Sequence, residues 1–506
     1  MSRQDEIVKE RMKKIHELRK AGINPYAHKS QSTHTTLELQ EKYKSLKNEQ
    51  VKKDKVKVHG RLLSIRDMGK IAFGTLDDGY GKIQIVLQDG ETPNKIFEFV
   101  KKYIDSGDFI EAEGTILRTK RGELSVVLKS ASILTKSIYP LPEKWHGIQD
   151  EEERYRKRYL DIAMNPEVRE IFKRKSKFWQ TMRQFLLERG FMEVETPILE
   201  NTTGGAEARP FTTHHNALDL NVYLRISPEL WLKRLMVAGY PKVFEIGRIF
   251  RNEGMDAEHL QDYTQMEFYW AYADYNDGMK LVEEMYRHIA KETFGTLKFK
   301  IKGFDVDLGK KWEMYDFVPI IKKMTGINVL DTDIKEVENK LKELKVDYDR
   351  HGFNLNRGID NLWKYCRKKI SGPGFLINVP VMMEPLAKRM EENPALVERY
   401  QIILAGSEVG KGFSELNDPI DQLGRFEDQQ KLREQGDEEA QMKDDEFVEA
   451  LKYGMPPTTG FGISERLFSF LEGKPIRETV IFPLMKPAHS EMAKKEDSND
   501  RLDNKK

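Results

Sequence analysis

The hydrophobic pattern of the N-terminal part changes from helical spacing to strand alternation near residue 55. Apolar residues recur at helical spacing from Ile7 to Leu18, and Gly22 and Pro25 then end the pattern, which predicts an amphipathic helix. Short strand-like runs, separated by turn signals such as DDGYG and KRG, follow at residues 56–65, 81–88, 108–119 and 123–131. They predict a small closed barrel. The five-stranded OB barrel is the natural candidate, although periodicity alone does not distinguish it from another small barrel.

From about Glu151 the pattern is typical of a larger region of helices and strands. A long amphipathic helix is predicted at 166–188, and Gly190 follows its end. The run FMEVETPIL then predicts a strand that Pro197 ends or places at a sheet edge. Further strands are predicted at residues 224–227, 242–250 and 263–273, and further helices at residues 229–239 and 274–294.

These patterns predict an α+β protein with several parts. A helical extension at 1–50 precedes the barrel domain at 51–145, and a large domain follows at 146–487. Residues of about 315–370 are mostly helical and charged, which predicts an insertion between two strands of the main sheet. Residues 488–506 have too little apolar content to pack and are predicted to be disordered.

The composition narrows the class of protein. At 506 residues and 39% hydrophobic, the chain is expected to form two or three domains. No apolar run approaches the roughly 20 residues that cross a bilayer, and the first residues lack a secretory signal, so no membrane is expected and the cytoplasm is the expected compartment. The single cysteine, Cys366, excludes an intrachain disulfide and a multi-cysteine zinc site. Because 84 Lys and Arg balance 83 Asp and Glu, any nucleic-acid partner must be held by local basic patches.

Several charged residues suggest chemistry with a nucleotide. In RIFRNEG, Arg251 and Glu253 end a strand-like run, where a guanidinium can hold a phosphate or carboxylate and a carboxylate can hold an adenine amino group. Taken alone, such a pair is more often a surface ion pair. Glu408 and Glu415, seven residues apart, are suited to a strand or loop that faces a Mg²⁺–polyphosphate group.

Seven blocks of sequence together carry a resemblance to a known family. They are GFMEVETPIL with GGAEARPFTTHHNALD, then LRISPELWLKRL, FRNEG, MEFYWAYADY, GFSELND and GISERLF. With them, the chain resembles the bacterial-type class II lysyl-tRNA synthetases. The resemblance implies an N-terminal OB anticodon-binding domain and a catalytic domain built on a six- to seven-stranded antiparallel sheet. It also implies a homodimer whose interface involves the stretch around Pro197.

The resemblance implies a two-step ligase reaction. Such an enzyme activates L-lysine with ATP, in the presence of Mg²⁺, to give lysyl-adenylate and pyrophosphate, and then transfers lysine to the 3′ end of tRNA(Lys). By resemblance, Arg251 contacts the α-phosphate and the lysine carboxylate, Glu253 contacts adenine, and Tyr263 stacks on its ring. Arg466 covers the other face of adenine and binds the γ-phosphate, while His259 and Glu408 complete the ATP site.

The lysine and metal sites are assigned in the same way. Gly205 and Glu229 are expected to meet the α-amino group, and Glu415, with Glu267 and Tyr269, is expected to bind the ε-ammonium group. Phe413 is expected to form an apolar wall for the aliphatic stem, because a buried cation needs a paired carboxylate and the stem needs apolar contact. The expected metal ligands are Glu408, Gln401 and Glu415.

Three residues of the barrel match family positions that contact the anticodon. Phe73 is expected to stack on a base, and Gln84 and Glu123 are expected to bond base edges, as the recognition of single-stranded RNA requires. Without the resemblance, a place in the barrel core is the preferred interpretation of Phe73.

The chain departs from the family pattern at three places. Gln401 stands where the family usually has another Mg²⁺-binding carboxylate, and Lys411 stands in GKGFSE where the family usually has Asn. Lys411 is placed either against the substrate carboxylate, against the adenylate phosphate, or away from both. The glycine-rich run GFGISER before Arg466 is one residue shorter than usual.

Three other functions fit the sequence less well than lysine activation and transfer. Aspartyl- and asparaginyl-tRNA synthetases share the barrel and the FRNE motif, but they need a cationic pocket, whereas PEL, MEFY and SELND favour lysine. Relatives that attach lysine to a protein lack the barrel. A non-catalytic RNA-binding paralogue is disfavoured because Arg251 and Arg466 are both present.

Overall fold

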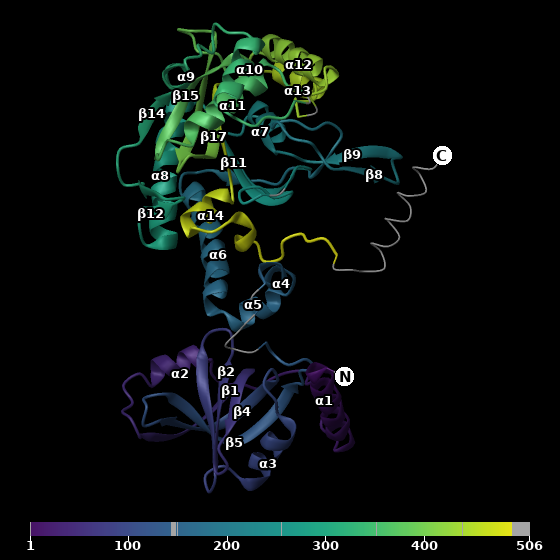
Figure 1. Cartoon of the computed structure of the whole chain (residues 1–506), viewed down its shortest axis with the longest axis vertical. Helices are drawn as coiled ribbons and strands as arrows, with labels where there is room; N and C mark the ends of the chain where they lie inside the picture. Colours follow the sequence, from purple (N-terminus) through teal and green to yellow (C-terminus); the bar gives the residue numbers. More distant parts are fainter. Residues whose placement is uncertain are drawn as a thin grey trace. The chain divides into compact units, whose positions relative to one another are not determined.

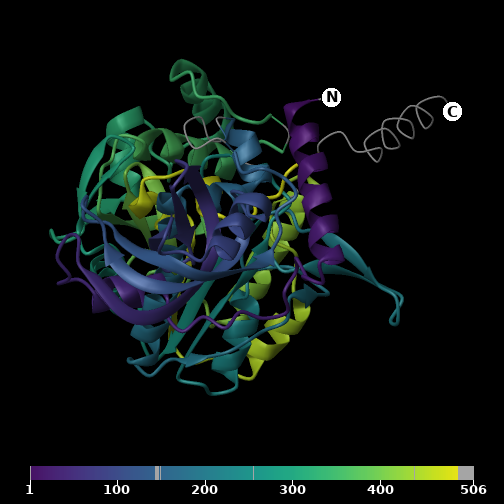
Figure 2. The ribbon, with the colours of Figure 1, turned by 90° about the horizontal axis from the view of Figure 1, so that it is seen from below.

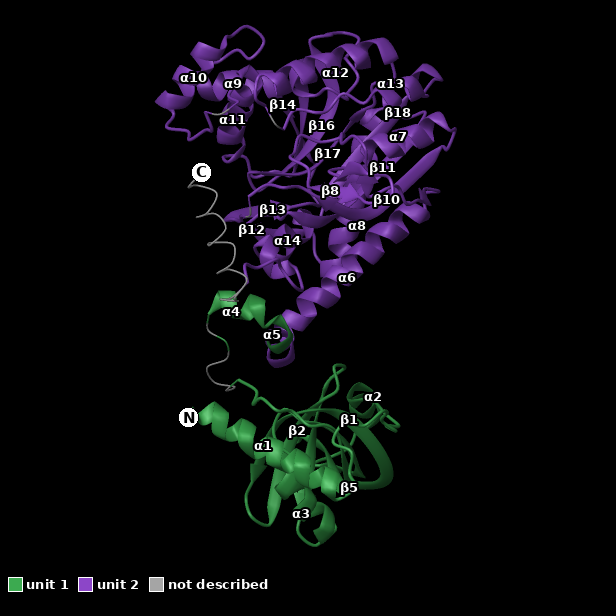
Figure 3. Ribbon diagram, turned by 90° about the vertical axis from the view of Figure 1, so that its right-hand side faces the viewer, with its two compact units in different colours: residues 1–160 green, residues 161–506 purple. Residues whose placement is uncertain are grey.

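A computed structural model describes residues 2–142, 148, 150–254, 256–350, 352–437 and 439–487. The chain divides into two compact units, unit 1 with residues 1–160 and unit 2 with residues 161–506 (Figure 3). The predicted tail at 488–506 lies outside the described residues. No helix in the described part of the chain is long and apolar enough to span a membrane.

Unit 1 is built around a closed five-stranded barrel with the strand order β1-β2-β3-β5-β4. All neighbours in the barrel pair antiparallel except β3 and β5, which pair parallel. Its strands are β1 (Val51–Asp67), β2 (Ile71–Asp77), β3 (Lys82–Gln88), β4 (Phe109–Arg118) and β5 (Leu124–Thr135). Its helices are α1 (Arg3–Lys20), α2 (Thr36–Lys42), α3 (Asn94–Tyr103) and α4 (Glu151–Arg156), and α5 (Arg158–Met164) crosses the division between the units.

The barrel has the predicted architecture, and alternation explains its core. Figure 2 shows the barrel strands curving around their common centre, with α1 beside them. Val56, Val58 and Leu62 of β1 point into the core, and Leu18 and Leu39 of the two N-terminal helices join it. The predicted helical extension therefore packs on the barrel.

One barrel strand, β2, was not among the predicted strands. Gly74 interrupts its apolar pattern, and a Cβ atom at Gly74 would lie 2.9 Å from side-chain carbons of Ile85 and Leu62. The close approach of the neighbouring strands therefore requires a residue that weakens the strand signal in the sequence.

Unit 2 is built on an eight-stranded sheet with the order β14-β15-β16-β17-β18-β11-β10-β6. The six central strands pair antiparallel, as predicted, but a parallel strand is added at each edge, so the sheet is wider than the expected six or seven strands. The strands are β6 (Met192–Glu193), β10 (Lys242–Phe250), β11 (Asp262–Ala271), β14 (Glu313–Asp316), β15 (Gly374–Pro380), β16 (Leu396–Leu404), β17 (Ser407–Ser414) and β18 (Thr458–Ser464).

Helices cover both faces of this sheet, and two smaller sheets flank it (Figure 1). The small sheets contain β7 (Leu199–Glu200), β8 (Thr212–His215) and β9 (Leu220–Leu224), and β12 (Lys298–Ile301) and β13 (Phe304–Asp307). One hydrophobic core includes residues of α6 (Pro166–Leu187), α8 (Tyr275–Phe294) and α14 (Arg466–Glu472). The other includes residues of α7 (Glu229–Val237), α9 (Phe317–Thr325), α10 (Ile334–Glu343), α11 (Leu355–Arg367), α12 (Pro419–Glu434) and α13 (Asp445–Lys452). Two short 3₁₀ helices lie at η1 (Val381–Met383) and η2 (Ile476–Thr479).

Most of the strands and helices predicted for unit 2 are present. Helices α9, α10 and α11 lie between β14 and β15, which pair directly in parallel. Pro197 lies between the short strands β6 and β7. The strand predicted at 224–227 was wrong, because β9 ends at Leu224. The buried Arg225 instead donates hydrogen bonds to the Arg248 carbonyl and to Glu245, which fix this segment as a loop before α7.

Candidate active site

A cavity of about 330 Å³ lies on one face of the large sheet of unit 2. Strand alternation decides which residues reach it, because successive side chains of a strand point to opposite faces. On β11, Met266 and Phe268 pack into the core formed with α6 and α8, whereas Gln265, Glu267 and Tyr269 line the cavity. Strands β16, β17 and β18 also contribute to its wall.

Most of the predicted site residues of unit 2 meet in this cavity. Those that line it are Gly205, Glu229, Arg251, Tyr263, Glu267, Tyr269, Gln401, Glu408, Lys411, Phe413, Glu415 and Arg466. Glu253 and His259 are not part of its lining. His259 Nε2 nevertheless lies 3.3 Å from a terminal nitrogen of Arg466, next to the cavity wall.

Strand β17 connects two groups of charged residues in the cavity. Glu408 lies at its start, and Glu415 directly follows its last residue. At roughly 3.3 Å per residue, seven residues of extended chain span a distance that an amino acid joined to a nucleotide can fill. We call the group around Glu415 (Glu229, Lys233, Glu267 and Glu415) the carboxylate cluster. The arginine cluster is the group around Glu408 and Arg466, which also includes Glu258, His259, Lys302 and Arg367.

The carboxylate cluster holds three buried carboxylates and one ammonium group, which pairs with two of them. Lys233 Nζ lies 2.7 Å from Glu229 Oε1 and 2.5 Å from Glu415 Oε2. It also lies 5.2 Å from the centre of the Phe413 ring. Glu267 instead accepts hydrogen bonds from Ser227 Oγ at 2.7 Å and from the Tyr269 hydroxyl at 3.0 Å.

The pKa values of the carboxyl groups in this cluster are raised, because the carboxylates are buried and outnumber the cations. Burial, together with repulsion from Glu229, raises the pKa of Glu267 to about 7. Burial also raises the pKa values of Glu229 and Glu415, and Lys233 only partly offsets this effect. Burial alone would lower the pKa of Lys233, but the carboxylates of Glu229 and Glu415 outweigh it and raise this pKa. The internal cation is therefore held charged, while the carboxylates compete for it.

Glu415 is also positioned to receive a further donor. Its Oε2 pairs with Lys233, whereas its Oε1 is buried and accepts no hydrogen bond from the part of the chain that the structure describes. A Cβ atom at Gly460 would lie 2.2 Å from Glu415 Oε1, so only glycine leaves room for this carboxylate. An unpaired buried acceptor is costly, which makes this end of the cavity a strong site for a cationic group.

A second ionic group occupies the wall between the two clusters. Glu384 Oε2 lies 3.1 Å from Lys411 Nζ and 3.2 Å from Arg399 Nε, and Arg399 also donates to Gln401 Oε1 at 2.7 Å. Burial alone would raise the pKa of Glu384, but Lys411 and Arg399 outweigh it and hold this pKa below its usual value. The wall beside β17 thus presents two cations held by one ionised carboxylate.

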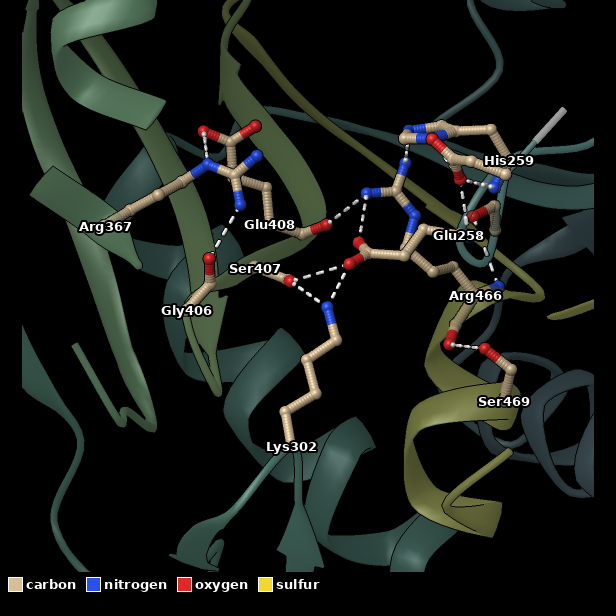
Figure 4. A network of polar contacts seen from close by, with 11 residues as sticks. Glu258, His259, Lys302, Arg367, Gly406, Ser407, Glu408, Arg466 and Ser469 are labelled. Carbon is tan, nitrogen blue, oxygen red and sulfur yellow. Dashed lines mark hydrogen bonds and ion pairs between the residues drawn. The ribbon is translucent and has the colours of Figure 1, made fainter. Parts of the chain in front are cut away.

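The arginine cluster is a network of cations and carboxylates at the start of α14 (Figure 4). Arg466 donates a hydrogen bond of 3.1 Å to the Glu408 carbonyl and lies 3.8 Å from Glu258 Oε2. Glu258 also pairs with Lys302. The side chain of Glu408 accepts from Trp363 Nε1 at 2.6 Å and lies 3.6 Å from Arg367. Cations gathered in this way suit a polyanionic group.

Comparisons with known proteins give one match for unit 1 and another for unit 2. A family profile described as tRNA synthetases class II (D, K and N) matches residues 150–486. A profile described as OB-fold nucleic acid binding domain matches residues 56–134. The chain belongs to the class II tRNA synthetases.

The curated relatives of this class II synthetase cover nearly the whole chain. The lysine--tRNA ligase of Thermotoga maritima is 44% identical, over 95% of this chain and 96% of that protein. The lysine--tRNA ligase of Roseiflexus sp. is 44% identical over 96% of this chain and 99% of its own length. The lysine--tRNA ligase of Carboxydothermus hydrogenoformans is 44% identical over 96% of this chain and 98% of that protein.

Of the predicted metal ligands of this class II synthetase, Glu408 is the one whose surroundings suit a Mg²⁺ ion that binds through substrate oxygens. Of the three predicted metal ligands, Glu415 pairs with Lys233 and the Gln401 side-chain oxygen accepts from Arg399. Glu408 remains, and its contacts with Trp363 and Arg367 both involve Oε1. The described residues contain no group of three His, Cys, Asp or Glu side chains placed to hold a metal ion. Because Mg²⁺ binds few carboxylates and keeps phosphate and water oxygens, Glu408 and a polyphosphate form a suitable set.

In the barrel of the synthetase, Phe73 lies on β2, Gln84 lies on β3, and Glu123 directly precedes β5. Gln84 donates to Glu123 Oε2 at 3.1 Å and accepts from Ser125 Oγ at 2.9 Å. Phe73 is half-buried, in contrast to the core positions Ala72 and Leu76 on either side of it. Thr75 pairs with Gln84, so Phe73 and Gln84 face the same outer side of the barrel. Phe73 therefore lies on the outer side of the barrel and is not one of its buried core residues.

Sequence reasoning missed six charged residues of the two clusters and of the wall between them. Their positions became clear only in the fold, and they are Lys233, Glu258, Lys302, Arg367, Glu384 and Arg399. A local signal was available for two of them. Lys233 follows Glu229 by four residues on one face of a helix, and Arg399 precedes Gln401 by two residues on one face of a strand.

Proposed function

We propose that the protein is a lysine--tRNA ligase that activates L-lysine with ATP and transfers it to the 3′ end of tRNA(Lys). The observation that carries this proposal is the carboxylate cluster, in which one buried oxygen of Glu415 pairs with Lys233 and the other has no donor among the described residues. The relatives at 44% identity over nearly the full chain carry the same name.

Charge balance in the cluster supports lysine as the amino acid. Glu229, Glu267 and Glu415 carry three negative charges when ionised, and Lys233 supplies one positive charge. Lysine brings two ammonium groups, so its binding would neutralise the cluster. The ε-ammonium is assigned to Glu415, Glu267 and Tyr269, the aliphatic stem to Phe413, and the α-ammonium to Glu229 and the segment at Gly205.

The same charges discriminate against other amino acids. Aspartate would place a carboxylate beside Glu415, and asparagine would leave the buried carboxylates without a cation. A site with buried polar groups rejects ligands that leave those groups unpaired, by on the order of 10⁴-fold in favourable cases. Arginine and ornithine keep the positive charge of the lysine side chain but differ from it in length. They therefore test the depth of the pocket rather than the sign of its charge.

In the activation step, the lysine carboxylate attacks the α-phosphorus and pyrophosphate leaves, so no side chain acts as nucleophile. Arg251 is assigned to the α-phosphate and the lysine carboxylate. Its Nε is buried and has no acceptor among the described residues, and its guanidinium lies 5.7 Å from the centre of the Tyr263 ring. Fixed cations of this kind align the reacting groups and stabilise the charge that develops on the phosphorus oxygens.

The remaining contacts are assigned to ATP. Arg466 and His259 are assigned to the terminal phosphates, Tyr263 to the adenine ring, and Glu253 to the adenine amino group. Lys411 is assigned to the carboxylate or phosphate side of the adenylate. Mg²⁺, held by Glu408 and the phosphates, would supply Lewis-acid neutralisation of the polyphosphate.

The barrel is assigned to the anticodon, with stacking on Phe73 and base-edge bonds to Gln84 and Glu123. We also propose a homodimer, because the segment around Pro197 exposes Met192, Ile198 and Leu199. Since the reaction consumes ATP and charges tRNA for translation, the proposed compartment is the cytoplasm.

ATP–pyrophosphate exchange tests the activation step. Lysine, arginine, ornithine, aspartate and asparagine are offered separately, in Mg²⁺, and exchange is expected with lysine at least 10³-fold above aspartate and asparagine. Exchange with aspartate instead would overturn the assignment of the carboxylate cluster. Folded protein that binds tRNA(Lys) but supports no exchange with any amino acid would favour a non-catalytic RNA-binding function.

A further inference from the structure

The turn between β12 and β13 brings a lysine to the arginine cluster. Lys302 and Gly303 form a two-residue turn, and both have positive φ values, 49° and 85°. Such turns favour Asn, Asp or Gly at these positions, so the backbone gives no reason for a lysine. The ammonium group of Lys302 reaches Glu258, and it also lies 2.9 Å from Ser407 Oγ and 4.6 Å from the centre of the Phe470 ring.

Glu258 is shared by two cations. One of its carboxylate oxygens pairs with Lys302, and the other lies 3.8 Å from Arg466 (Figure 4). Ser407 Oγ also donates to Glu258, at 3.4 Å. Burial alone would raise the pKa of Glu258, but Lys302 and Arg466 outweigh it and hold this pKa below its usual value. An internal anion therefore bridges Lys302 and Arg466.

A pair of phosphate groups is a better bridge between these cations than one carboxylate. Two cations that share a single carboxylate are close enough to be spanned by a diphosphate, which is longer and more highly charged. Glu258 and Lys302 keep 21% and 41% of their side chains exposed, so Glu258 can turn into water without leaving a buried charge behind.

We infer that Lys302 contacts the terminal phosphates of ATP, and that Glu258 occupies this phosphate site in the free protein and is displaced when ATP binds. The inference rests on the proposed function, since it extends the ATP site assigned to Arg466. It adds a residue from the β12–β13 turn, a segment that contributes nothing to the lining of the cavity.

The test measures direct binding of Mg²⁺–ATP and of pyrophosphate by calorimetry, without lysine, and then the KM values in the exchange reaction. Lys302→Met is expected to weaken ATP and pyrophosphate binding about tenfold, as the loss of one charge-assisted contact predicts, and to leave the KM for lysine unchanged. Lys302→Arg is expected to restore most of the affinity. Lys300→Met, at an exposed position of the same hairpin, is the matched control and should change neither ligand.

Glu258→Gln separates ligand contact from simple support of the loop. If Glu258 competes with phosphate, this variant binds ATP about threefold more tightly than the unmodified protein. If the pair only holds the loop in place, Glu258→Gln weakens ATP binding as Lys302→Met does, and the inference is wrong. Unchanged ATP and pyrophosphate affinities in Lys302→Met would also overturn it.

The two hypotheses fail in different ways. Absence of lysine-dependent exchange in the unmodified protein contradicts the proposed function, while pyrophosphate binding to Lys302 is still measured directly. Normal exchange with an unaffected Lys302→Met variant contradicts the further inference alone.

Discussion

The carboxylate cluster and the arginine cluster lie at opposite ends of β17 and handle charge in opposite ways. The side chains of Lys233 and Glu415 are fully buried, whereas Lys302 and Arg466 are 41% and 22% exposed. In the carboxylate cluster, the charged groups are buried, and the carboxylates outnumber the cations. In the arginine cluster, each cation is already paired with an internal carboxylate or carbonyl.

The difference reflects two kinds of recognition. Buried charges that water cannot satisfy make a wrong ligand costly, so they suit the choice among amino acids that differ by a single group. Partly exposed ion pairs cost little to exchange, so they suit a polyphosphate that must bind and leave as pyrophosphate in every cycle. Selection is therefore expected at one end of the cavity and turnover at the other.

Glu415→Gln should produce the largest effect. Breaking a buried ion pair costs about 3–5 kcal/mol, so kcat/KM for lysine is expected to fall about 10³-fold while direct ATP binding changes little. Steady-state exchange and calorimetry give the two values. The exposed Glu391→Gln is the control, and thermal unfolding must show that both variants fold. Equal losses for lysine and ATP would mean that the two ends do not act separately.

Arg466→Lys should have the next largest effect, on the other substrate. The ammonium group keeps the charge but loses the planar, forked geometry of the guanidinium, so kcat/KM for ATP is expected to fall about 10²-fold. Lysine binding, measured by calorimetry without ATP, should be unchanged. A comparable loss of lysine affinity would contradict the separation.

Lysine binding should depend on pH because the carboxylate cluster must be ionised to receive cations. The free-protein pKa of Glu267 is about 7, and those of Glu229 and Glu415 are also raised. Lysine favours the ionised forms, so protons are released on binding and the dissociation constant is expected to fall about tenfold from pH 6 to pH 8. Calorimetry in buffers of different ionisation enthalpy measures the released protons. Glu267→Gln should flatten the profile, and an unchanged slope would remove Glu267 as its cause.

A change in salt concentration should give the smallest effect, and it should weaken ATP binding more than lysine binding. Raising ionic strength from about 0.05 to 0.5 M screens partly exposed charges, so ATP binding is expected to weaken about fivefold and lysine binding less than twofold. Titrations of each ligand at both salt concentrations give the comparison. A stronger salt effect on lysine would indicate that the carboxylate cluster is open to solvent.

Sequence patterns predicted the frame of this molecule well where periodicity was unbroken. The run from 242 to 250 is β10, and the run at 263–273 covers all of β11 except its first residue. On β11, alternation explains both the core residues and the cavity residues. Periodicity failed where a local contact overrode it, as at Gly74 in β2 and at Arg225, whose buried guanidinium holds a loop where a strand was predicted.

Only those residues of the candidate site that belong to sequence motifs could be predicted. Motif residues such as Glu229, Glu267 and Glu415 do line one cavity. Lys302 could not be assigned, because it lies 44 residues after Glu258 and the two meet only when the β12–β13 turn packs beside the loop after β10. Contacts of this kind depend on tertiary packing, and no local spacing encodes them.

The parallel pairing of β14 and β15 has a consequence for how this enzyme can vary. Joining two neighbouring parallel strands takes a crossover of about a dozen residues, and α9 alone is long enough to provide most of it. The chain through α10 and α11 is therefore not needed to connect the two strands, and both helices add buried residues to the second core. Since Trp363 and Arg367 of α11 contact Glu408, we expect changes in this helical segment to alter nucleotide binding more than lysine binding, because the carboxylate cluster lies outside the segment.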